Sequence, residues 1–488
     1  MIPDSSKVNL RSELKNSIFR RIGAIADAMP RETYVVGGYV RDIMLERPSH
    51  DIDFVTVGSG IALAKEVARD LGKKGRLTVY ANYGTARIVH HDLELEFVGA
   101  RRESYTRDSR NPIVEDGTLA DDQLRRDFTI NAMAICLNAD RFGELVDPFD
   151  GVEDLRRRII RTPADPDVTF SDDPLRMMRA VRFASQLDFS IHPDTFEAIR
   201  HNAPRIEIIT KERINDELMK IMRSPRPSVG LRLLEESGLL PLIFPELQAL
   251  KGVETVEGRG HKDNFYHTLQ VVDNVAARSD NEWLRWAALL HDIAKPVTKR
   301  YDAKLGWTFH NHNFIGEKMV GRIFRNMKLP QNEKMKYVSK LVGLHMRPQQ
   351  VGEEGVSDSG VRRLITDAGT DIDDLMILAE SDLTSKNPVK VRSALESFAA
   401  LRTRIDEIIA ADDYRRWHNP INGHEIMDYF HIPGSPVLAK IKQAVKDAIL
   451  DGRIPNDHDA AWDYVLSIAP DYGLTPGGGA DTINLTRT

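Results

Sequence analysis

The stretch YVVGGYVRDIMLERPSHDIDFVT, residues 34–56, contains the residues around which the chain is organised. Its apolar residues 34–36 predict a buried strand, the glycines at 37 and 38 predict a turn, and residues 39–45 predict a helix. A second apolar run holds Asp51 and Asp53. Side chains at positions i and i+2 of a strand point to the same face, so these two carboxylates should lie together.

Two carboxylates on one strand face repel each other unless a cation lies between them, and magnesium prefers oxygen ligands. The turn at Gly37 and Gly38 leads into a helix N-terminus, whose backbone N–H groups and dipole attract phosphate. A lone D-x-D is more often a pair of solvated acids, and a lone Gly-Gly is more often an ordinary turn. The combination at this short spacing is more specific and predicts a metal–triphosphate site.

A further strand pattern follows at residues 93–98, where Glu94 and Glu96 alternate with apolar residues and should share one face. This predicted strand is a natural source of a third carboxylate near the metal. The polar residues 106–116 then predict a loop. At residues 124–137 the sequence LRRDFTINAMAICL predicts an apolar helix preceded by Arg125, Arg126 and Asp127. Paired arginines suit phosphate oxygens, and the alternative is an ordinary charged helix start with Asp127 near the positive end of the helix dipole.

Composition is typical of a soluble globular protein, since 41% of the 488 residues are hydrophobic and 29% are charged. The length suits roughly three domains. No apolar run approaches the ~20 residues that span a bilayer, the N-terminus lacks a signal-peptide core, and no membrane partner is expected. The single cysteine, Cys136, favours a reducing compartment, so a cytoplasmic location is expected. A net charge of −6 neither predicts nor excludes a nucleic-acid partner.

Five motifs occur in order between residues 37 and 184: GGYVRD, DID, RRDFTINAMA, LVDPFDGVEDL and DDPLRMMRAVRFA. Together they resemble the bacterial class II tRNA nucleotidyltransferase family, which contains CCA-adding enzymes and poly(A) polymerases. The resemblance implies a metal-binding pair at Asp51 and Asp53, with Glu96 as a third catalytic carboxylate. It also implies nucleotide binding by Gly37, Gly38, Arg41, Asp42, Arg125, Arg126, Asp127, Asp173 and Arg176.

Within that set the resemblance assigns reading of the incoming base to Asp173 and Arg176. The two residues are three apart, so an ordinary ion pair on a helix surface is the alternative. Two conservative departures from the family pattern are visible. Asp172 stands where the family often has glutamate, and Glu96 stands where it more often has aspartate. Both exchanges keep a carboxylate, but the sequence does not fix the exact position of its oxygen atoms.

A second group of motifs follows: NFYHTLQVV, RWAALLHDIAKP, FHNHNFIG, LVGLHMRP and AESDLTS. A single histidine on an apolar helix is more often a core residue, but a His-Asp pair inside ALLHDIAK is harder to explain that way. The pattern resembles the HD superfamily of metal-dependent phosphohydrolases. Histidine and aspartate are good ligands for a divalent transition metal, and the candidates are His267, His291, Asp292, His312, His345 and Asp382. Arg107 and Lys295 are as readily interpreted as solvated surface charges.

The predicted fold class is α+β, with a polymerase-beta-type mixed sheet and helices followed by all-helical domains that include an HD domain. The expected divisions are a catalytic head at 1–160, a helical neck for base and RNA binding at 161–245, an HD domain at 246–400, a C-terminal helical region at 401–472 and a disordered tail at 473–488. The opening helix is expected at residues 6–29. Residues 170–222 are expected to be entirely helical.

The predicted function is addition of CCA to the 3′ end of tRNA from CTP and ATP, with two Mg²⁺ ions at Asp51 and Asp53. The alternatives are a poly(A) polymerase acting on RNA 3′ ends and an HD phosphohydrolase whose front half binds RNA. The motifs are shared among these enzymes, so they do not separate CCA addition from A-only or CC-only addition. No obligate protein partner is evident from the sequence.

Overall fold

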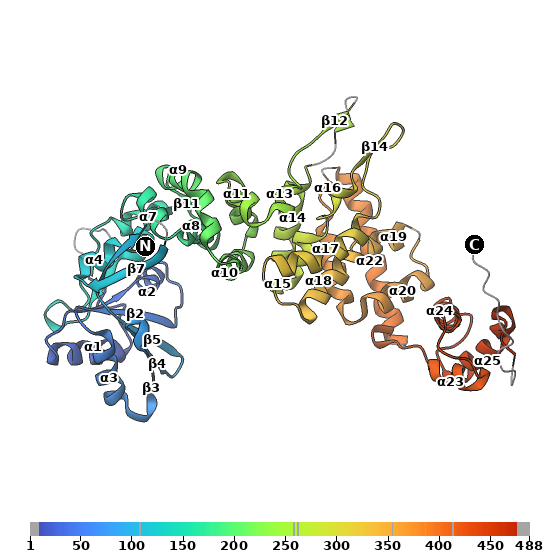
Figure 1. Ribbon diagram of the computed structural model, residues 1–488, viewed down its shortest axis with the longest axis horizontal. Helices are drawn as coiled ribbons and strands as arrows, with labels where there is room; N and C mark the ends of the chain where they lie inside the picture. The colour runs from blue at the N-terminus through green and yellow to red at the C-terminus, as the bar shows by residue number, and fades with distance from the viewer. Residues whose placement is uncertain are drawn as a thin grey trace. The chain divides into compact units, whose positions relative to one another are not determined.

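The computed structural model describes residues 9–475 except 107–108, 257–258, 261–262, 354, 386 and 412–413. The chain forms two compact units, Met1–Lys251 with Met327–Leu329, and Gly252–Asn326 with Pro330–Thr488. Figure 1 shows the sheet of the first unit in blue and the helices of the second unit from green to red. From residue 476 onward, the predicted disordered tail lies outside the described residues.

The first unit opens on a seven-stranded mixed sheet in the order β3-β4-β5-β2-β1-β8-β9. β2 and β5 run parallel, and every other neighbouring pair is antiparallel. This sheet confirms the predicted fold of the N-terminal part. Its strands are β1 (Thr33–Val36), β2 (Asp51–Thr56), β3 (Arg76–Tyr80), β4 (Thr85–His90), β5 (Leu93–Gly99), β8 (Ala134–Cys136) and β9 (Leu145–Val146).

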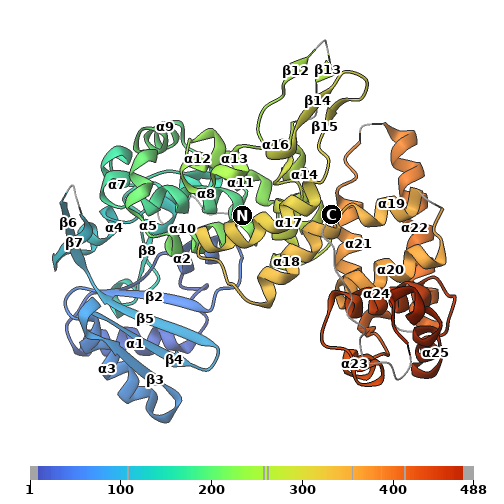
Figure 2. The same ribbon diagram turned by 45° about the vertical axis from the view of Figure 1, so that its right-hand side comes forward.

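One face of the sheet is covered by helices α1 (Ser17–Ala28) and α3 (Gly60–Leu71), which lie beside the strands in Figure 2. Phe54 of β2 and Phe97 of β5 stack there with ring centroids 4.8 Å apart, and Phe19 of α1 packs against Phe54. Since side chains alternate along a strand, burying Phe54 on this face directs Asp53 to the opposite one. The apolar core therefore orients the carboxylates.

Three segments of the first unit differ from the prediction. Residues 134–136 form the strand β8 after a single helical turn, α5 (Thr129–Ala132), because β8 is buried between β1 and β9, where an apolar run is equally suited to a strand. The described residues of the expected loop at 106–116 lie instead on β6 (Arg101–Thr106) and β7 (Ser109–Asp116), which pair with each other antiparallel. The opening helix begins only at residue 17, because the Asn16 side chain accepts a hydrogen bond from the Ile18 backbone and caps it.

The rest of the first unit is mainly helical, and α8 lies against α7, α10 and α11. Residues 170–222 also contain a two-residue strand, β11 (Ser190–Ile191), which pairs with β10 (Ile159–Ile160) and which the sequence did not predict. The helices are α2 (Gly38–Met44), α4 (Leu119–Leu124), α6 (Gly151–Arg157), α7 (Pro166–Asp172), α8 (Leu175–Leu187), α9 (Pro193–Asn202), α10 (Lys211–Met222), α11 (Pro227–Glu236), α12 (Leu240–Ile243) and α13 (Pro245–Gln248).

The second unit is helical, with two short strand pairs, β12 (Thr255–Val256) with β13 (Arg259–Gly260) and β14 (Arg300–Asp302) with β15 (Gly306–Thr308). None of the described helices is long and apolar enough to span a membrane. The helices are α14 (Asn264–Ala276), α15 (Glu282–Leu290), α16 (Lys295–Thr298), α17 (His312–Asn326), α18 (Glu333–Leu344), α19 (Arg347–Glu353), α20 (Asp358–Ala368), α21 (Ile372–Ser381), α22 (Pro388–Ala411), α23 (Gly423–Phe430), α24 (Pro436–Leu450) and α25 (His458–Ile468).

The core of the second unit surrounds α15. Every residue of this helix from Trp283 to Leu290 is buried, which is the pattern of a helix enclosed on all sides. Trp286 packs against Phe324 of α17, with ring centroids 6.2 Å apart. This packing holds the end of α15, where the predicted His-Asp pair lies, at the centre of the unit.

Candidate active site and metal centre

The predicted carboxylates lie on the two parallel strands of the sheet. In the register of β2 and β5, Asp53 is opposite Glu96 and Asp51 is opposite Glu94. Glu94 is neutralised by an ion pair with Arg87. The structure therefore brings Asp51, Asp53 and Glu96 together, while the fourth carboxylate has a protein partner of its own.

Burial and nearby negative charge disfavour ionisation of Asp53 and Glu96. Burial raises the pKa of Asp53, and the neighbouring Asp51 raises it further against the opposing effect of Arg126. Loss of hydration raises the pKa of Glu96, and the charge of Asp53 adds to that effect. A divalent cation would relieve this repulsion, and an all-oxygen donor set of this kind suits a hard cation such as Mg²⁺.

The glycine turn brings the backbone close to the carboxylates. Gly37 has a φ of +75°, a conformation that L side chains rarely adopt. A Cβ at this position would lie 3.1 Å from Nη1 of Arg126 and 3.4 Å from Oδ2 of Asp53. The absence of a side chain therefore leaves the space between the arginine and the aspartate open, as a bound triphosphate requires.

The two arginines of the RRD motif are held by a residue that the sequence analysis did not single out. Asp122 is fully buried and pairs with Arg125, and also with Arg126 at 2.9 Å. Its spacing to the two arginines, i,i+3 and i,i+4, is a signal that could have identified it. Asp122 fixes the direction of both guanidinium groups.

Arg41 and Asp42 are engaged with each other. The Arg41 guanidinium pairs with Asp42 at 2.8 Å and donates to Oδ1 of Asn131 at 2.9 Å. It also lies over the ring of Phe183, 5.1 Å from its centroid. The structure thus places Arg41 against the protein, and direct contact with phosphate stays a prediction.

The third residue of the RRD motif joins the turn before α5 to helix α8. Asp127 is buried, and Nε of Arg179 donates to its carboxylate at 2.7 Å. Burial opposes ionisation of Asp127, but Arg179 and a hydrogen bond from Asn131 lower its pKa to about 2. Arg179, three residues beyond Arg176 on α8, is a second residue that the motif analysis missed.

Asp173 and Arg176 lie at the N-terminal end of α8 and are not paired with each other in the described part of the chain. The Asp173 carboxylate accepts from the Leu175 backbone N–H at 3.2 Å. Nη2 of Arg176 donates to the carbonyl of Arg125 at 2.8 Å. The alternative of an ordinary i,i+3 ion pair is therefore wrong, and Arg176 is tied directly to the RRD turn.

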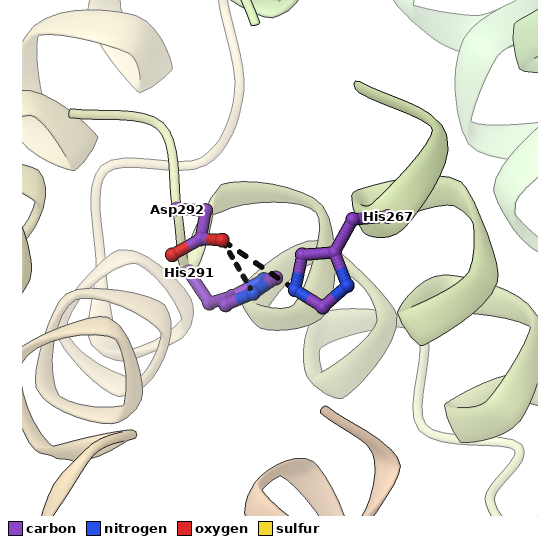
Figure 3. A group of neighbouring side chains, drawn as sticks. All are labelled: His267, His291 and Asp292. Atoms are coloured by element: carbon purple, nitrogen blue, oxygen red, sulfur yellow. Dashed lines mark ion pairs between the residues drawn. The ribbon is translucent and has the colours of Figure 1, made fainter. Parts of the chain in front are cut away.

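The six candidate ligands of the second unit converge from five separate segments. His267 lies on α14, His291 and Asp292 follow α15, His312 begins α17, His345 follows α18 and Asp382 follows α21. The first three surround one point in Figure 3. All six are buried except Asp382, whose side chain is 24% exposed.

Asp292 is shared by two groups of possible metal ligands. The first consists of His267, His291 and Asp292, and the second of Asp292, His312 and His345. Nε2 of His291 lies 3.2 Å from Oδ2 of Asp292, and Nε2 of His312 lies 3.4 Å from Oδ1. Asp382 completes the first group, since its Oδ1 lies 2.8 Å from Nε2 of His267. One carboxylate oxygen faces each group, which is the arrangement of a bridging ligand.

The four histidines are oriented alike. Nδ1 of His291, His345 and His312 bonds the backbone carbonyls of Ala288, Val342 and Phe309, and Nδ1 of His267 bonds the Thr384 hydroxyl, at 2.7 to 2.9 Å. This leaves Nε2 directed into the cluster in every case. In the described part of the chain, the buried Nε2 of His291 has no hydrogen-bond partner. Outer hydrogen bonds that fix the imidazole are characteristic of metal-binding histidines, so these residues fit a metal ion.

Charge within the cluster is balanced by opposite groups. Burial lowers the pKa of His291, but Asp292 and Asp382 outweigh it and raise the value to about 10. Burial and the charge of His291 lower the pKa of His345 to about 4. Nζ of Lys295 lies 2.6 Å from Oδ2 of Asp292, so the interpretation of this lysine as a solvated surface charge is wrong. Arg107 lies outside the described residues.

Three family models match the chain in sequence order. Residues 33–161 match the poly A polymerase head domain, residues 188–251 match a domain described as the probable RNA and SrmB-binding site of polymerase A, and residues 264–377 match the HD domain. The three matches cover the sheet, helices α9 to α13 and five of the six ligands of the His/Asp cluster, and they leave helices α7 and α8 uncovered.

Curated relatives and a solved structure agree with these matches. An A-adding tRNA nucleotidyltransferase of Deinococcus radiodurans is 32% identical over 354 residues, which are 70% of this chain and 78% of the relative. A multifunctional CCA protein of Hahella chejuensis is 34% identical over 62% of this chain and 69% of the relative. A tRNA nucleotidyltransferase crystallised with a primer tRNA and an incoming ATP analog aligns with a TM-score of 0.55 and 27% identity, covering 78% of this chain and 98% of the other.

Proposed function

The chain belongs to the tRNA nucleotidyltransferase family, and on that premise we propose that it adds CCA to the 3′ end of tRNA from CTP and ATP. The observation that carries the proposal is the register of β2 and β5, which sets Asp51, Asp53 and Glu96 together beside the glycine turn. A site for two-metal nucleotidyl transfer needs this combination of grouped carboxylates and an adjacent phosphate-binding loop.

We propose Mg²⁺ as the cation that Asp51 and Asp53 hold with assistance from Glu96. When bound there, it would activate the RNA 3′-hydroxyl and neutralise the leaving pyrophosphate. Arg126 would hold the triphosphate, since its Nη1 lies beside Gly37 and Asp53, and Asp122 would keep the guanidinium in that direction. Arg125, held by the same carboxylate, would support the phosphates from the other side of the turn.

We assign base selection to Asp173 and Arg176. Both CTP and ATP carry an amino group beside a ring-nitrogen acceptor, so one carboxylate and one guanidinium can read either base. UTP and GTP would place a carbonyl against Asp173 and leave a polar group unpaired. The bond from Arg176 to the Arg125 carbonyl supports this assignment, because it couples the base reader to the phosphate-binding turn.

Two other nucleotide specificities share these motifs. The relative from D. radiodurans is named an A-adding enzyme, and poly(A) polymerases use the same head. The experiment offers CTP, ATP or both to tRNAs that end before CCA, after C or after CC. CCA addition predicts three nucleotides on the shortest tRNA only with both substrates. An A-adding enzyme would extend only the tRNA ending in CC, a CC-adding enzyme would stop after two cytidines, and a poly(A) polymerase would make long tails with ATP alone.

We infer a second activity, hydrolysis of phosphoesters, for the His/Asp cluster of the second unit. The two ligand groups that share Asp292 support it, since paired metal sites of this type activate water for attack on phosphorus. The substrate class is a phosphate ester such as a cyclic phosphate at an RNA end. The assay is release of phosphate or opening of a 2′,3′-cyclic phosphate by the purified protein, compared with its Asp292→Asn variant.

A further inference from the structure

The ring of Phe183 on α8 lies among three arginines. The Cζ atoms of Arg182, Arg41 and Arg179 are 3.9, 5.1 and 5.5 Å from its centroid. Phe128 meets the same ring edge-on, with centroids 5.8 Å apart. The face of an aromatic ring is negative and attracts a cation within about 6 Å. Because Phe183 is only 6% exposed, water weakens these attractions little.

The three guanidinium groups would repel one another without counter-charges, and each has a carboxylate partner from a different element. The partners, at 2.5 to 2.8 Å, are Asp42 of α2 for Arg41, Asp127 of the RRD turn for Arg179 and Glu217 of α10 for Arg182. Desolvation offsets much of the attraction in a buried ion pair, so such pairs add little net stability and are better suited to specify one arrangement. The surroundings of Phe183 therefore tie α2, the RRD turn and α10 to α8.

Three contacts along one face of α8 hold this helix in place. Arg176, Arg179 and Phe183 are spaced i, i+3 and i+7, so they lie on the same face over a length of about 10 Å. The first two bond to the RRD turn, and the third contacts Arg41 of α2. Two contacts with one turn would allow the helix to tilt about that turn, and a third contact with a different element prevents the tilt.

The contact with Arg41 connects α8 to the glycine turn, because α2 begins directly after Gly37. A nucleotide whose triphosphate lies at this turn has to present its base to Asp173 and Arg176 at the start of α8. The distance between the turn and the base-reading residues therefore has to be fixed. Groups that bind or react with a substrate generally need to be held within about 0.5 Å of their productive positions.

We propose that Phe183 is a positioning residue for nucleotide addition, whose ring holds α8 against α2 and so sets the base-reading residues at the correct distance from the glycine turn. This inference deepens the proposed function and rests on it for the role of Asp173 and Arg176. Because the ring is buried, it acts through Arg41 and not by contact with the nucleotide.

The alternative is that Phe183 only fills space in the core. Packing depends on the shape of the ring, whereas attraction of a cation depends on its π electrons, so the two can be changed separately. Fluorine atoms withdraw electrons from the face of the ring and change its size only slightly. A fluorinated ring should therefore keep the packing and lose the attraction.

The test replaces Phe183 in the full chain with phenylalanines that carry one, two or three ring fluorines. The control is the same series at Phe170 of α7, which is fully buried and has no arginine or lysine over its ring within the described part of the chain. The measurements are the KM for CTP and ATP, the discrimination against UTP and GTP, and the maximal rate with ATP.

We expect the KM to rise and the discrimination to fall with each fluorine added at position 183, by about two- to fivefold in total, the range for one cation–π contact. The maximal rate should change less, because the carboxylates of the sheet are untouched. The Phe170 series should change neither the KM nor the discrimination. A KM and a discrimination that stay constant across the Phe183 series would overturn the proposal and return the ring to core packing.

A double-mutant cycle locates the effect between the two helices. Arg41→Gln removes the cation of α2 and keeps a polar side chain there. In this background three fluorines at position 183 should lose most of their effect on the KM, because the contact between α2 and α8 is already absent. An undiminished effect would belong to the arginines of α8 itself and would overturn the proposed link between the helices.

Failure of the proposed function and failure of this inference give different results. A protein that adds only A would correct the nucleotide specificity, and its KM for ATP would still report on Phe183. A protein that adds no nucleotide would refute the proposed function, and the dissociation constant for ATP would then replace the KM, with the same rise expected for each fluorine. A protein that adds CCA with a KM independent of fluorine would keep the function and refute the role of Phe183.

Discussion

The carboxylate group of the sheet and the His/Asp cluster of the second unit differ in ligand type, burial and distance along the chain. Asp51, Asp53 and Glu96 lie within 46 positions, offer oxygen only and repel one another. The His/Asp cluster spans positions 267–382, combines nitrogen with oxygen and balances positive against negative groups inside the core. The first arrangement needs a cation to become stable, whereas the second is already neutralised and oriented.

This difference indicates two uses of metal. An open oxygen site can share its cation with the phosphates of a substrate, and the cation can enter and leave with the nucleotide. A buried site with histidines fixed by outer hydrogen bonds is suited to a resident ion. Substitutions at each site test this difference in metal use.

The largest effect is expected at the sheet. Asp53→Asn should lower nucleotide addition by at least about a thousandfold, because it removes several kcal/mol of transition-state charge stabilisation and 1.36 kcal/mol is tenfold in rate. Binding of tRNA should survive. The matched control is Glu94→Gln on the paired strand, whose carboxylate is already neutralised by Arg87. A residual rate above about a tenth of wild type, or equal losses in both variants, would remove Asp53 from the metal site.

The second effect concerns tightly held metal in the His/Asp cluster. Asp292→Asn should remove all of it, because this carboxylate belongs to both ligand groups, whereas His345→Gln should remove only part. Loss of a residue that binds the metal directly should weaken metal binding more than loss of a residue that only hydrogen-bonds a ligand, which weakens it by roughly 10–100-fold. Metal content after dialysis, measured by mass spectrometry, gives the result. The control is Asp373→Asn at an exposed position of α21.

Assays of nucleotide addition by the same variants show whether the two sites function independently. Asp292→Asn should keep its rate of CTP and ATP incorporation, since its carboxylate belongs to the other unit. Equal metal content in the wild type and Asp292→Asn would return the cluster to a role in core packing. Loss of nucleotide addition in Asp292→Asn would contradict the independence of the two sites.

A smaller effect is expected for base selection. Asp173→Ala should reduce discrimination of CTP and ATP against UTP and GTP by about tenfold, the equivalent of one unpaired buried polar group. Arg176→Ala should reduce it too and should also raise the KM for nucleotide, because its side chain holds the Arg125 carbonyl. Incorporation of all four nucleotides into tRNA measures this. Unchanged selectivity in both variants would place base reading elsewhere.

The smallest effect is on stability without metal. Folding raises the pKa of Asp53 above its value in the unfolded chain. Ionisation of Asp53 therefore opposes folding once the pH exceeds the pKa of the unfolded chain, and this destabilisation disappears at lower pH. In the presence of a chelator at neutral pH, Asp53→Asn should therefore raise the free energy of unfolding by about 1 kcal/mol. This is the size expected when the repulsion between two like charges near the protein surface is removed. Thermal unfolding measures it. A lower melting temperature would show that the carboxylate stabilises the fold instead.

The sequence pattern predicted the N-terminal sheet well where the positions of the functional side chains depend only on alternation along one strand. The D-x-D pair and the alternating Glu94 and Glu96 were placed on strands, and the register confirms that Asp53 faces Glu96. The prediction failed at residues 134–136, where an apolar run suits a helix and a central strand equally. Which of the two forms depends on the partners β1 and β9, and these are not local information.

Residue types and strand alternation alone specify the ligand types and the grouping of Asp51 with Asp53, and motif resemblance specifies the six residues of the His/Asp cluster. The groups that hold these residues in place depend on how the folded chain packs. Arg179 reaches Asp127 and Arg176 reaches the Arg125 carbonyl from helix α8, a segment about fifty positions further along the chain, and the His/Asp cluster is assembled from five separate segments. The physical reason is that chain order sets which residues can share a face, whereas burial and charge pairing are settled when distant segments pack together.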